Sequence, residues 1–326
     1  MVAETSGTLQ TRAGEQHESH VANQWVLVVH GGAPLAVLPY SKEEHIRRHA
    51  ALKKALHAGE SILASGGTSL DAVQAAVRVL EDAPEFNAGR GAALTHERYA
   101  EMDASIMSGR NRRVGAVAGL RRVRNPIELA RSVMERSNHV FLVGQGAEEF
   151  AANQGIAFAD PEYFVTERQI KELRKAIEDE SITRPAAVGG MSGTVGAVAL
   201  DGHGDLAAGT STGGMTNKRY GRIGDSPVIG AGTYAENGVC AVSGTGWGEY
   251  FIRNAVAHDL CARVKYANES VESAAKHVID EVSRMGGYGG VIAVDAKGHI
   301  AMPRSAPMAH GYIMAGKQAV TVLEDT

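Results

Sequence analysis

The sequence predicts a layered α/β or α+β protein made of two halves, and three observations carry this prediction. Short apolar runs typical of strands are followed by helical patterns in both halves. A charged segment separates the halves, with 12 charged residues among the 25 at positions 160–184. Glycine accounts for 39 of the 326 residues, against 9 prolines, which indicates tight turns and close backbone approaches rather than disorder.

The composition excludes several classes of partner. Lys and Arg number 33 and Asp and Glu 37, for a net charge of −4, so we expect no nucleic-acid surface and no polybasic membrane anchor. Residues 1–24 are polar and predict a flexible tail without a secretory signal, which indicates a cytoplasmic protein. Cys240 and Cys261 are too few for a disulfide framework, so we expect two buried free thiols.

The first half opens with a strand and a long helix. Residues 25–30 are continuously apolar and end at a glycine pair, which predicts a strand that is buried on both faces. Ser41 with Glu44 three residues later forms a capping box, so a helix should begin there and stop near Gly66-Gly67.

Two more helices follow in the first half. Apolar residues on one face predict the second helix, and Pro84 should end it. These apolar residues are Leu70, Val73, Val77 and Leu80. Asn125 and Pro126 suit the N-cap and first residue of a third helix. Residues 115–119 and 141–144 are too short for an assignment.

The charged segment predicts a linker over about 155–193. A helix around 169–177 fits the pattern, but it would have little to bury, so we expect a solvated linker. After it the pattern turns strongly β, because residues 194–201 and 206–212 flank Gly202–Asp205 as in a hairpin. Further strands are predicted at 228–234, 239–243, 290–295 and 299–302, and helices at 249–266 and 270–285.

Common catalytic motifs are absent: the chain has no G-x-S-x-G elbow, phosphate-binding loop or H-E-x-x-H helix. Four Gly- and Thr-rich runs stand out instead, and each alone would suggest only a strand or a turn. They are Gly193-Thr194-Val195-Gly196-Ala197-Val198-Ala199-Leu200-Asp201, Thr210-Ser211-Thr212-Gly213-Gly214, Gly221-Arg222-Ile223-Gly224-Asp225-Ser226-Pro227 and Ser243-Gly244-Thr245-Gly246-Trp247-Gly248-Glu249.

In this order the four runs resemble the plant-type L-asparaginase/isoaspartyl peptidase (β-aspartyl peptidase) family of N-terminal-nucleophile hydrolases. The likeness extends from about Val26 to Met302 and includes His30-Gly31-Gly32-Ala33, Phe86-Asn87-Ala88-Gly89, Asn125-Pro126 and Gly286-Gly287-Tyr288-Gly289-Gly290. The resemblance implies an α+β fold, the four-layer αββα sandwich, as one composite domain. It also implies two chains, an α subunit over 25–193 and a β subunit over 194–326.

The resemblance implies that the precursor cuts itself between Gly193 and Thr194. A threonine inside a chain has no adjacent base, whereas a free α-amino group with a reference pKa of about 7.7–8.0 lies close to its own hydroxyl. Thr194 would therefore be the nucleophile and its amino group the base. Thr212 would orient the Thr194 hydroxyl, and Thr245 with the Gly246 N–H would form the oxyanion hole.

The implied substrate is a free aspartyl head group. Arg222 would bind its α-carboxylate and Asp225 its α-ammonium, with Thr245 and Gly246 also in contact. Asn87, His30, Gly31 and Gly32 would line the nucleophile, although Asn87 is equally typical of a turn. L-Asparagine or β-aspartyl dipeptides would be hydrolysed to L-aspartate through a β-aspartyl ester on Thr194.

The family also implies an ion site and an assembly. No organic cofactor is expected, but a structural sodium ion would be bound by backbone carbonyls of the loop from Leu80 to Arg90. The implied loop residues are Leu80, Glu81, Ala83, Phe86, Ala88 and Arg90. The processed enzyme would be a heterotetramer of two α and two β chains.

Four features depart from the expected pattern, and two other functions stay open. Trp247 stands where a small hydroxyl residue is usual, and Arg90 replaces a smaller one; Pro34 directly follows the loop at 30–33, and residues 303–307 stand where P-F-N is common. Trp247 and Arg90 are either structural or reshape the leaving-group side of the site. A glycosylasparaginase-like amidase is one alternative function, although the chain lacks the D-T-I-G of that group. An uncut pseudoenzyme that binds amino acids is the other.

Overall fold

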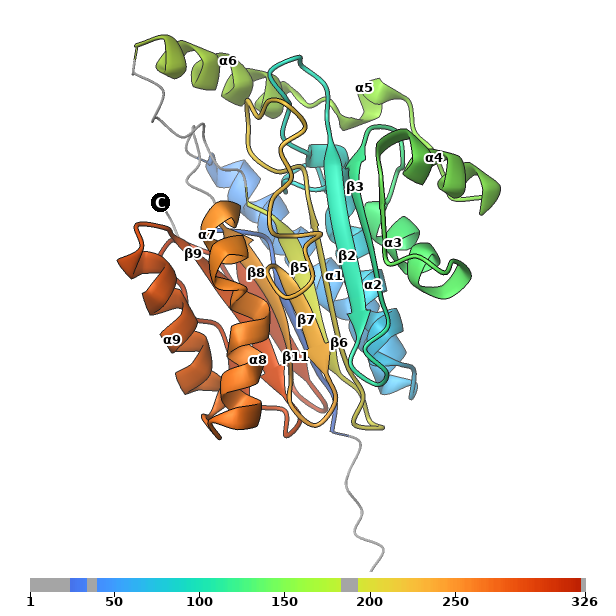
Figure 1. Ribbon diagram of the computed structural model, residues 1–326, viewed down its shortest axis with the longest axis vertical. Coiled ribbons are helices and arrows are strands. Elements are labelled where there is room, and N and C mark those ends of the chain that lie inside the picture. Colours follow the sequence, from blue (N-terminus) through green and yellow to red (C-terminus); the bar gives the residue numbers. More distant parts are fainter. Residues whose placement is uncertain (1–23, 34–39, 183–192, 324–326) are drawn as a thin grey trace, which may run out of the picture.

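The computed structural model describes residues 24–33, 40–182 and 193–323 and has two β-sheets between layers of helices (Figure 1). The α+β prediction is thus confirmed. Most of the predicted N-terminal tail lies outside the described residues, as do 183–192 of the predicted linker.

Eight strands form the larger sheet, and four form the smaller one. In spatial order the larger sheet contains β12 (Val320–Val322), β11 (His310–Met314), β1 (Val26–His30), β5 (Val195–Leu200), β6 (Leu206–Thr212), β2 (Met102–Ser108), β3 (Val114–Leu120) and β4 (Phe141–Val143). The smaller sheet contains β10 (Ile300–Ala301), β9 (Gly289–Asp295), β8 (Cys240–Gly246) and β7 (Thr233–Glu236). Strands β1, β5 and β6 therefore occupy the middle of the larger sheet.

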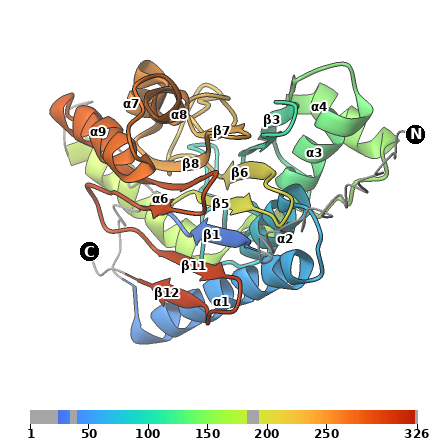
Figure 2. The ribbon, with the colours of Figure 1, turned by 90° about the horizontal axis from the view of Figure 1, so that it is seen from below.

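Helices cover the outer faces of both sheets. The larger sheet is covered by α1 (Lys42–Ala64), α2 (Ser69–Glu81) and α3 (Pro126–Arg136), and the smaller by α8 (Val256–Tyr266) and α9 (Val271–Arg284). The inner faces of the two sheets contact each other through β1, β5 and β6 on one side and β8 and β9 on the other. Figure 2 shows this order of layers from below.

Alternation along the central strands builds two apolar cores. In β1, Leu27 and Val29 face the helices α1 and α2, whereas Val26 and Val28 face the smaller sheet. Every residue of β1 is buried, as the continuous apolar run predicts. Strands β5 and β6 are buried along their whole lengths in the same way.

The predicted helix starts in the first half are confirmed. The Ser41 side chain caps α1 by accepting a hydrogen bond from the Glu44 N–H. The Glu44 carboxylate accepts one from the Ser41 N–H, which completes the capping box. Helix α2 ends at Glu81, shortly before Pro84, and α3 has Pro126 in its first turn.

From β5 to β10 the second half matches the predicted order with two differences. The β5–β6 hairpin is present, but β7 begins only at Thr233, because Val228 to Gly232 form hydrogen-bonded turns. The helix predicted over 249–266 is two helices, α7 (Gly248–Asn254) and α8, because Ala255 adopts a left-handed conformation with φ 46°.

Several elements were not predicted. They are β2, β11, β12 and α4 (Gly144–Asn153), while the two unassigned short runs correspond to β3 and β4, which pair in parallel. Strand β2 contains Asp103 and Ser105, so its pattern is not apolar, yet it is buried between β3 and β6. Its neighbours, rather than its own sequence, stabilise it as a strand.

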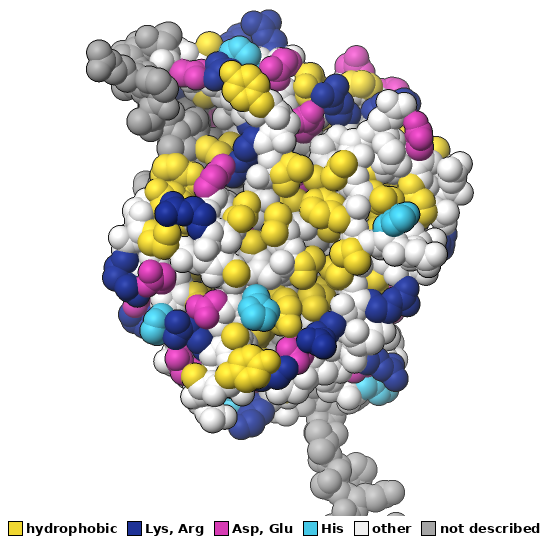
Figure 3. All heavy atoms as spheres, viewed as in Figure 1, with side chains coloured by type: hydrophobic (Ala, Val, Ile, Leu, Met, Phe, Trp, Pro, Cys, Tyr) yellow, Lys and Arg dark blue, Asp and Glu magenta, His cyan; other side chains and the backbone are white. Residues whose placement is uncertain are grey.

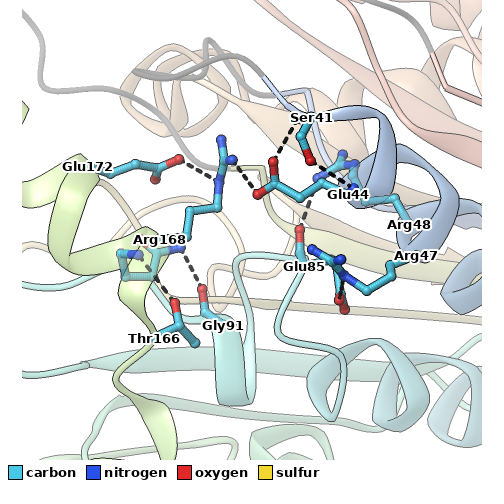
Figure 4. A network of polar contacts seen from close by, with 10 residues as sticks. Ser41, Glu44, Arg47, Arg48, Glu85, Gly91, Thr166, Arg168 and Glu172 are labelled. Atoms are coloured by element: carbon cyan, nitrogen blue, oxygen red, sulfur yellow. Dashed lines mark hydrogen bonds and ion pairs between the residues drawn. The ribbon is translucent and has the colours of Figure 1, made fainter.

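The prediction of a solvated linker is wrong for residues 161–182. They form α5 (Pro161–Phe164) and α6 (Glu167–Ile182), and Phe164 and Leu173 are buried in the core below α6. Arg168 also joins α6 to α1 through an ion pair with Glu44 at 2.8 Å (Figure 4). A few apolar positions on a charged helix suffice when a complementary surface receives them.

The prediction of free thiols is also wrong. Cys240 of β8 and Cys261 of α8 form a disulfide, with their Cα atoms 5.8 Å apart. Both residues are buried, as predicted, at 0% and 1% exposure. Sequence separation does not reveal such a pair, because it depends on how α8 packs on the smaller sheet.

The surface of the described residues carries no long apolar helix. None of the helices in these ranges is long and apolar enough to cross a membrane.

Figure 3 shows the face that carries α7 and α8, where apolar side chains gather in the middle and charged ones lie mostly around them.

Candidate active site

The candidate nucleophile lies where the ends of three central strands meet. Thr194 directly precedes β5, Thr212 ends the neighbouring β6, and His30 ends β1 opposite Gly196. The Thr194 Oγ1 donates a hydrogen bond of 3.0 Å to Thr212 Oγ1, which also accepts one of 2.9 Å from the Gly214 N–H. Thr194 is 9% exposed.

Backbone atoms pack tightly around the peptide bond before Thr194. The Gly193 carbonyl accepts a hydrogen bond of 3.3 Å from the Asn87 N–H. Gly32 has φ +95°, and a Cβ atom there would lie 2.2 Å from the Gly193 Cα. A side chain at Gly32 would therefore displace the peptide bond that precedes the candidate nucleophile.

Asn87 connects three segments around this bond. Its Nδ2 donates to the Gly214 carbonyl at 2.7 Å, and its Oδ1 accepts from the Ala93 N–H at the same distance. These contacts orient the Asn87 backbone N–H toward Gly193, so Asn87 is more than a turn residue.

His30 belongs to a buried polar network that sequence reasoning missed. Its Nδ1 lies 3.1 Å from the Thr194 carbonyl oxygen and its Nε2 lies 2.9 Å from Ser243 Oγ. The Ser243 hydroxyl contacts Thr210 Oγ1 at 2.7 Å, and Thr210 contacts Thr233 Oγ1 at 2.6 Å. Burial lowers the pKa of His30 to about 3, so the ring is neutral.

Thr245 and Gly246 end β8 beside the same backbone. Thr245 Oγ1 accepts a hydrogen bond of 3.1 Å from the Ala33 N–H, in the segment that packs on Gly193. Because this bond occupies a lone pair of Thr245, the hydroxyl proton remains able to donate to another group.

Arg222 and Asp225 flank the turn that follows β8. A Cβ atom on Gly248 would lie 2.7 Å from Asp225 Oδ1 and 3.0 Å from Arg222 Nη2. Gly214, whose N–H binds Thr212, lies on the other side of Arg222, whose Nη1 is 3.5 Å from the position of a Gly214 Cβ. The six predicted catalytic and substrate-binding residues are thus connected through adjoining segments.

Asp225 has the features expected of a residue that binds a cationic group. It is 4% exposed, and among the described residues its Oδ2 has no hydrogen-bond partner. Burial raises its pKa to about 7, although the Arg222 charge opposes the shift. A buried carboxylate oxygen without a partner is costly, and an ammonium group on a ligand would satisfy it.

Arg222 is held by a residue to which the sequence assigned no role. Its Nε and Nη2 each donate a hydrogen bond of 2.9 Å to the two carboxylate oxygens of Glu249. Glu249 closes the fourth Gly- and Thr-rich run, but nothing in a single sequence indicates that it faces Arg222.

The loop after α2 offers backbone oxygens at close range. A Cβ atom on Gly91 would lie 2.1 Å from the Phe86 carbonyl oxygen and 2.8 Å from that of Pro84, so two backbone carbonyl oxygens lie close to this glycine. In the described ranges no group of His, Cys, Asp and Glu side chains could hold a metal ion. Backbone carbonyl oxygens are ligands of the kind that hard cations prefer.

Of the departures from the expected pattern, Pro34 lies outside the described residues, and Arg90 and Trp247 lie in different surroundings. The exposed Arg90 side chain lies over the Tyr163 ring, 5.4 Å from its centroid, which favours the surface interpretation. Trp247 is half-buried, with its ring 4.9 Å from that of Tyr250 and 5.9 Å from that of Tyr288.

The chain is similar to known proteins over most of its length. A family model described as asparaginase matches residues 23–324. The isoaspartyl peptidase of Salmonella typhimurium is 45% identical over 86% of this chain and 92% of its own length. That of Escherichia coli is 44% identical over 85% and 89%, and the isoaspartyl peptidase/L-asparaginase of Rattus norvegicus is 44% identical over 90% and 87%.

Proposed function

The chain belongs to the asparaginase family, and from this membership we propose that it is a self-processing threonine hydrolase of L-asparagine and β-aspartyl dipeptides. The observation that carries the proposal is the contact between the Thr194 and Thr212 hydroxyls, in a site that also contains a half-buried arginine and a buried carboxylate oxygen without a hydrogen-bond partner among the described residues. The fold type we infer is the four-layer αββα sandwich of N-terminal-nucleophile hydrolases.

The first proposed reaction is cleavage of the chain's own backbone. The Thr194 hydroxyl attacks the Gly193 carbonyl, the Gly193–Thr194 amide becomes an ester, and water hydrolyses the ester. The close packing of Gly32 on Gly193 and the Asn87 N–H on the Gly193 oxygen support this step, because both hold the carbonyl still. The products are a chain over 1–193, which contains the α subunit after its N-terminal tail, and a β subunit over 194–326.

The second proposed reaction uses the amino group that the cut releases. This amine takes the Thr194 hydroxyl proton as the oxygen attacks the β-carbonyl of the substrate. Thr245 and the Gly246 N–H stabilise the oxyanion, and ammonia or an amine leaves with the proton. Water then cleaves the β-aspartyl ester and releases L-aspartate.

Substrate selection follows from the two charged residues. Arg222 binds the α-carboxylate and Asp225 the α-ammonium, which requires an aspartyl group whose amino and carboxyl groups are both free. Support comes from the buried Asp225 oxygen without a partner. Because the relatives named above are isoaspartyl peptidases, this substrate class is favoured over the glycosylated asparagine of glycosylasparaginases.

A structural sodium ion completes the proposed precursor fold. Backbone oxygens of the loop from Leu80 to Arg90 would hold it. The support for this site is that the carbonyl oxygens of Pro84 and Phe86 both lie close to Gly91. The ion would neutralise the repulsion between these oxygens and so stabilise the loop that orients Asn87. It takes no part in the reaction.

Assembly and location form two further parts of the proposal. We expect two α and two β chains to form a heterotetramer, for which the apolar side chains in the middle of the face in Figure 3 are suitable. A cytoplasmic protein is expected, in which burial of Cys240 and Cys261 protects their disulfide from thiol reductants.

Intact mass spectrometry of purified protein, followed by aspartate release from L-asparagine and from a β-aspartyl dipeptide, tests the proposal. We expect two chains that split after Gly193, and release of aspartate from both substrates. T194A should abolish cutting and turnover, while T321A, which removes a threonine from the edge strand β12, should leave both unchanged.

The alternative functions predict other results. Aspartate release from glycosylated asparagine alone would identify a glycosylasparaginase. A single uncut chain that binds aspartate without releasing product from any amide would identify a pseudoenzyme.

A further inference from the structure

The side chain that faces Arg222 suggests how this arginine is oriented, an inference that rests on the proposed function. A guanidinium has a side edge, formed by Nε and Nη2, and an end edge, formed by Nη1 and Nη2. The Glu249 carboxylate occupies the side edge with two hydrogen bonds of 2.9 Å. The end edge keeps its donors for a second carboxylate.

Glu249 is itself oriented by its neighbours. It lies in the first turn of α7 and its side chain is 45% exposed, whereas that of Arg222 is 18% exposed. Partial burial raises the pKa of Glu249, but the hydrogen bonds and charge of Arg222 outweigh it and lower the pKa overall. The lowered pKa keeps the Glu249 carboxylate ionised, and its two hydrogen bonds with Arg222 orient it.

We propose that Glu249 is a positioning residue that presents the end edge of Arg222 to the substrate α-carboxylate. A free arginine samples many rotamers, and fixing its planar group before binding reduces the entropy lost when the substrate binds. The ion pair also lowers the net positive charge at this end of the site, so orientation rather than charge is the gain.

Steady-state kinetics with L-asparagine test this role. We expect E249A to raise KM about tenfold with kcat changed less than about twofold, because the interaction acts on binding. E249Q keeps the shape and one acceptor and should raise KM less.

A double-mutant cycle separates positioning from general stability. If Glu249 acts through Arg222, adding E249A to R222A should change kcat/KM by less than about twofold. Intact mass spectrometry should show that E249A and E249Q are cut after Gly193 as fast as the unaltered protein. The matched control is E269A, which removes a carboxylate that pairs with Arg263 at 3.3 Å away from the site, and it should leave KM unchanged.

Three results would overturn the inference. They are an unchanged KM in E249A, an equal loss of kcat/KM when E249A is made in the unaltered protein and in R222A, or slower cutting in E249Q. Failure of the unaltered protein to release aspartate would instead refute the proposed function. The two failures are therefore distinguishable in the same set of assays.

Discussion

The hydrogen bonds that reach Thr194 have directions that can be worked out atom by atom. A carbonyl oxygen can only accept, so the proton of neutral His30 lies on Nδ1 and is donated to the Thr194 carbonyl. Nε2 must then accept from the Ser243 hydroxyl, which in turn accepts from Thr210. A continuous series of hydrogen bonds thus connects Thr210, between the two sheets, with the carbonyl of the candidate nucleophile.

Removing Ser243 should break this series of hydrogen bonds. S243A leaves the buried Nε2 of His30 without a donor, so we expect a loss of about 1–3 kcal/mol in the free energy of unfolding and slower self-cleavage. Chemical denaturation and a mass-spectrometric time course measure both effects. S283A alters a part-buried serine that donates to a carbonyl of its own helix, α9, and should change neither quantity. Equal stability of S243A and the unaltered protein would contradict the proposed series of hydrogen bonds.

Asp225 should shape the pH dependence of the reaction. Its pKa of about 7 in the free protein means that it is partly protonated at neutral pH, and only its ionised form pairs with an ammonium group. The freed amine of Thr194, with a reference pKa of about 7.7–8.0, must also be deprotonated to act as a base. We therefore expect kcat/KM to rise with pH through this range by more than one proton.

The D225N variant isolates one of these two ionisations. It should leave a one-proton rise in kcat/KM, at a much lower value because ammonium binding is lost. Profiles of kcat/KM between pH 5 and 9 measure this change. A flat profile for the unaltered protein would rule out both assignments.

At the scale of elements, α6 contacts segments on both sides of the proposed cut. Its Glu180 forms two hydrogen bonds, of 2.6 and 2.7 Å, with Arg219. Arg219 belongs to the segment between Thr212 and Arg222. At the other end of the helix, Gln169 donates to the Gly91 carbonyl at 2.8 Å. A helix with these anchors should stay in place after the cut rather than be released as a linker.

Limited proteolysis tests the docking of α6. Leu173 is 3% exposed, so L173A should destabilise the packing of α6 by about 2–5 kcal/mol and expose the helix to protease. K171A, which alters an exposed residue of the same helix, should be cleaved no faster than the unaltered protein. Rapid cleavage of α6 in the unaltered protein would contradict the predicted docking.

The disulfide joins two other elements, β8 and α8. It closes a segment with a sequence separation of 21, for which loss of the link typically costs about 3 kcal/mol through the entropy of the unfolded chain. The C240A/C261A double variant should lose about that much stability, measured by chemical denaturation. Thiol labelling of the unfolded, unreduced protein is the control, since two free thiols there would show that the pair is not linked.

For the whole molecule, two buried groups set opposite limits to stability. The neutral His30, whose pKa burial lowers to about 3, favours folding above its unfolded value of 6.5 and loses this contribution as pH falls toward 3. Burial raises the pKa of Glu81 to about 8, so its contribution is complete below 4.5 and is lost as pH rises to 8. Between 6.5 and 8, Glu81 opposes folding without compensation from His30.

The E81Q variant should remove this alkaline loss. The unaltered protein should lose up to about 1.4 kcal/mol of unfolding free energy per pH unit between 6.5 and 8, because the folded state holds one more proton. The glutamine keeps the acceptor for Ser211, which Glu81 binds at 2.7 Å, without a titrating group. Denaturation curves at several pH values measure the slope, and an equal slope in both proteins would contradict the prediction.

Much of the fold could be predicted because the signals are local. The capping box at Ser41, the apolar run of β1 and the hairpin between β5 and β6 each depend on residues close in sequence. Strand β2 and the helix α6 could not be predicted in this way. Their polar residues are compatible with burial only because neighbouring elements supply partners, and no local pattern records those neighbours.

The site divides along the same line. The sequence by itself determined the candidate nucleophile, the arginine and the acid, because the four Gly- and Thr-rich runs carry them in a specific order. Only the tertiary structure decided that Glu249 faces Arg222, that His30 reaches Thr194 through its ring, and that Cys240 pairs with Cys261. The physical reason is distance along the chain: these contacts join segments whose proximity follows from the packing of two sheets.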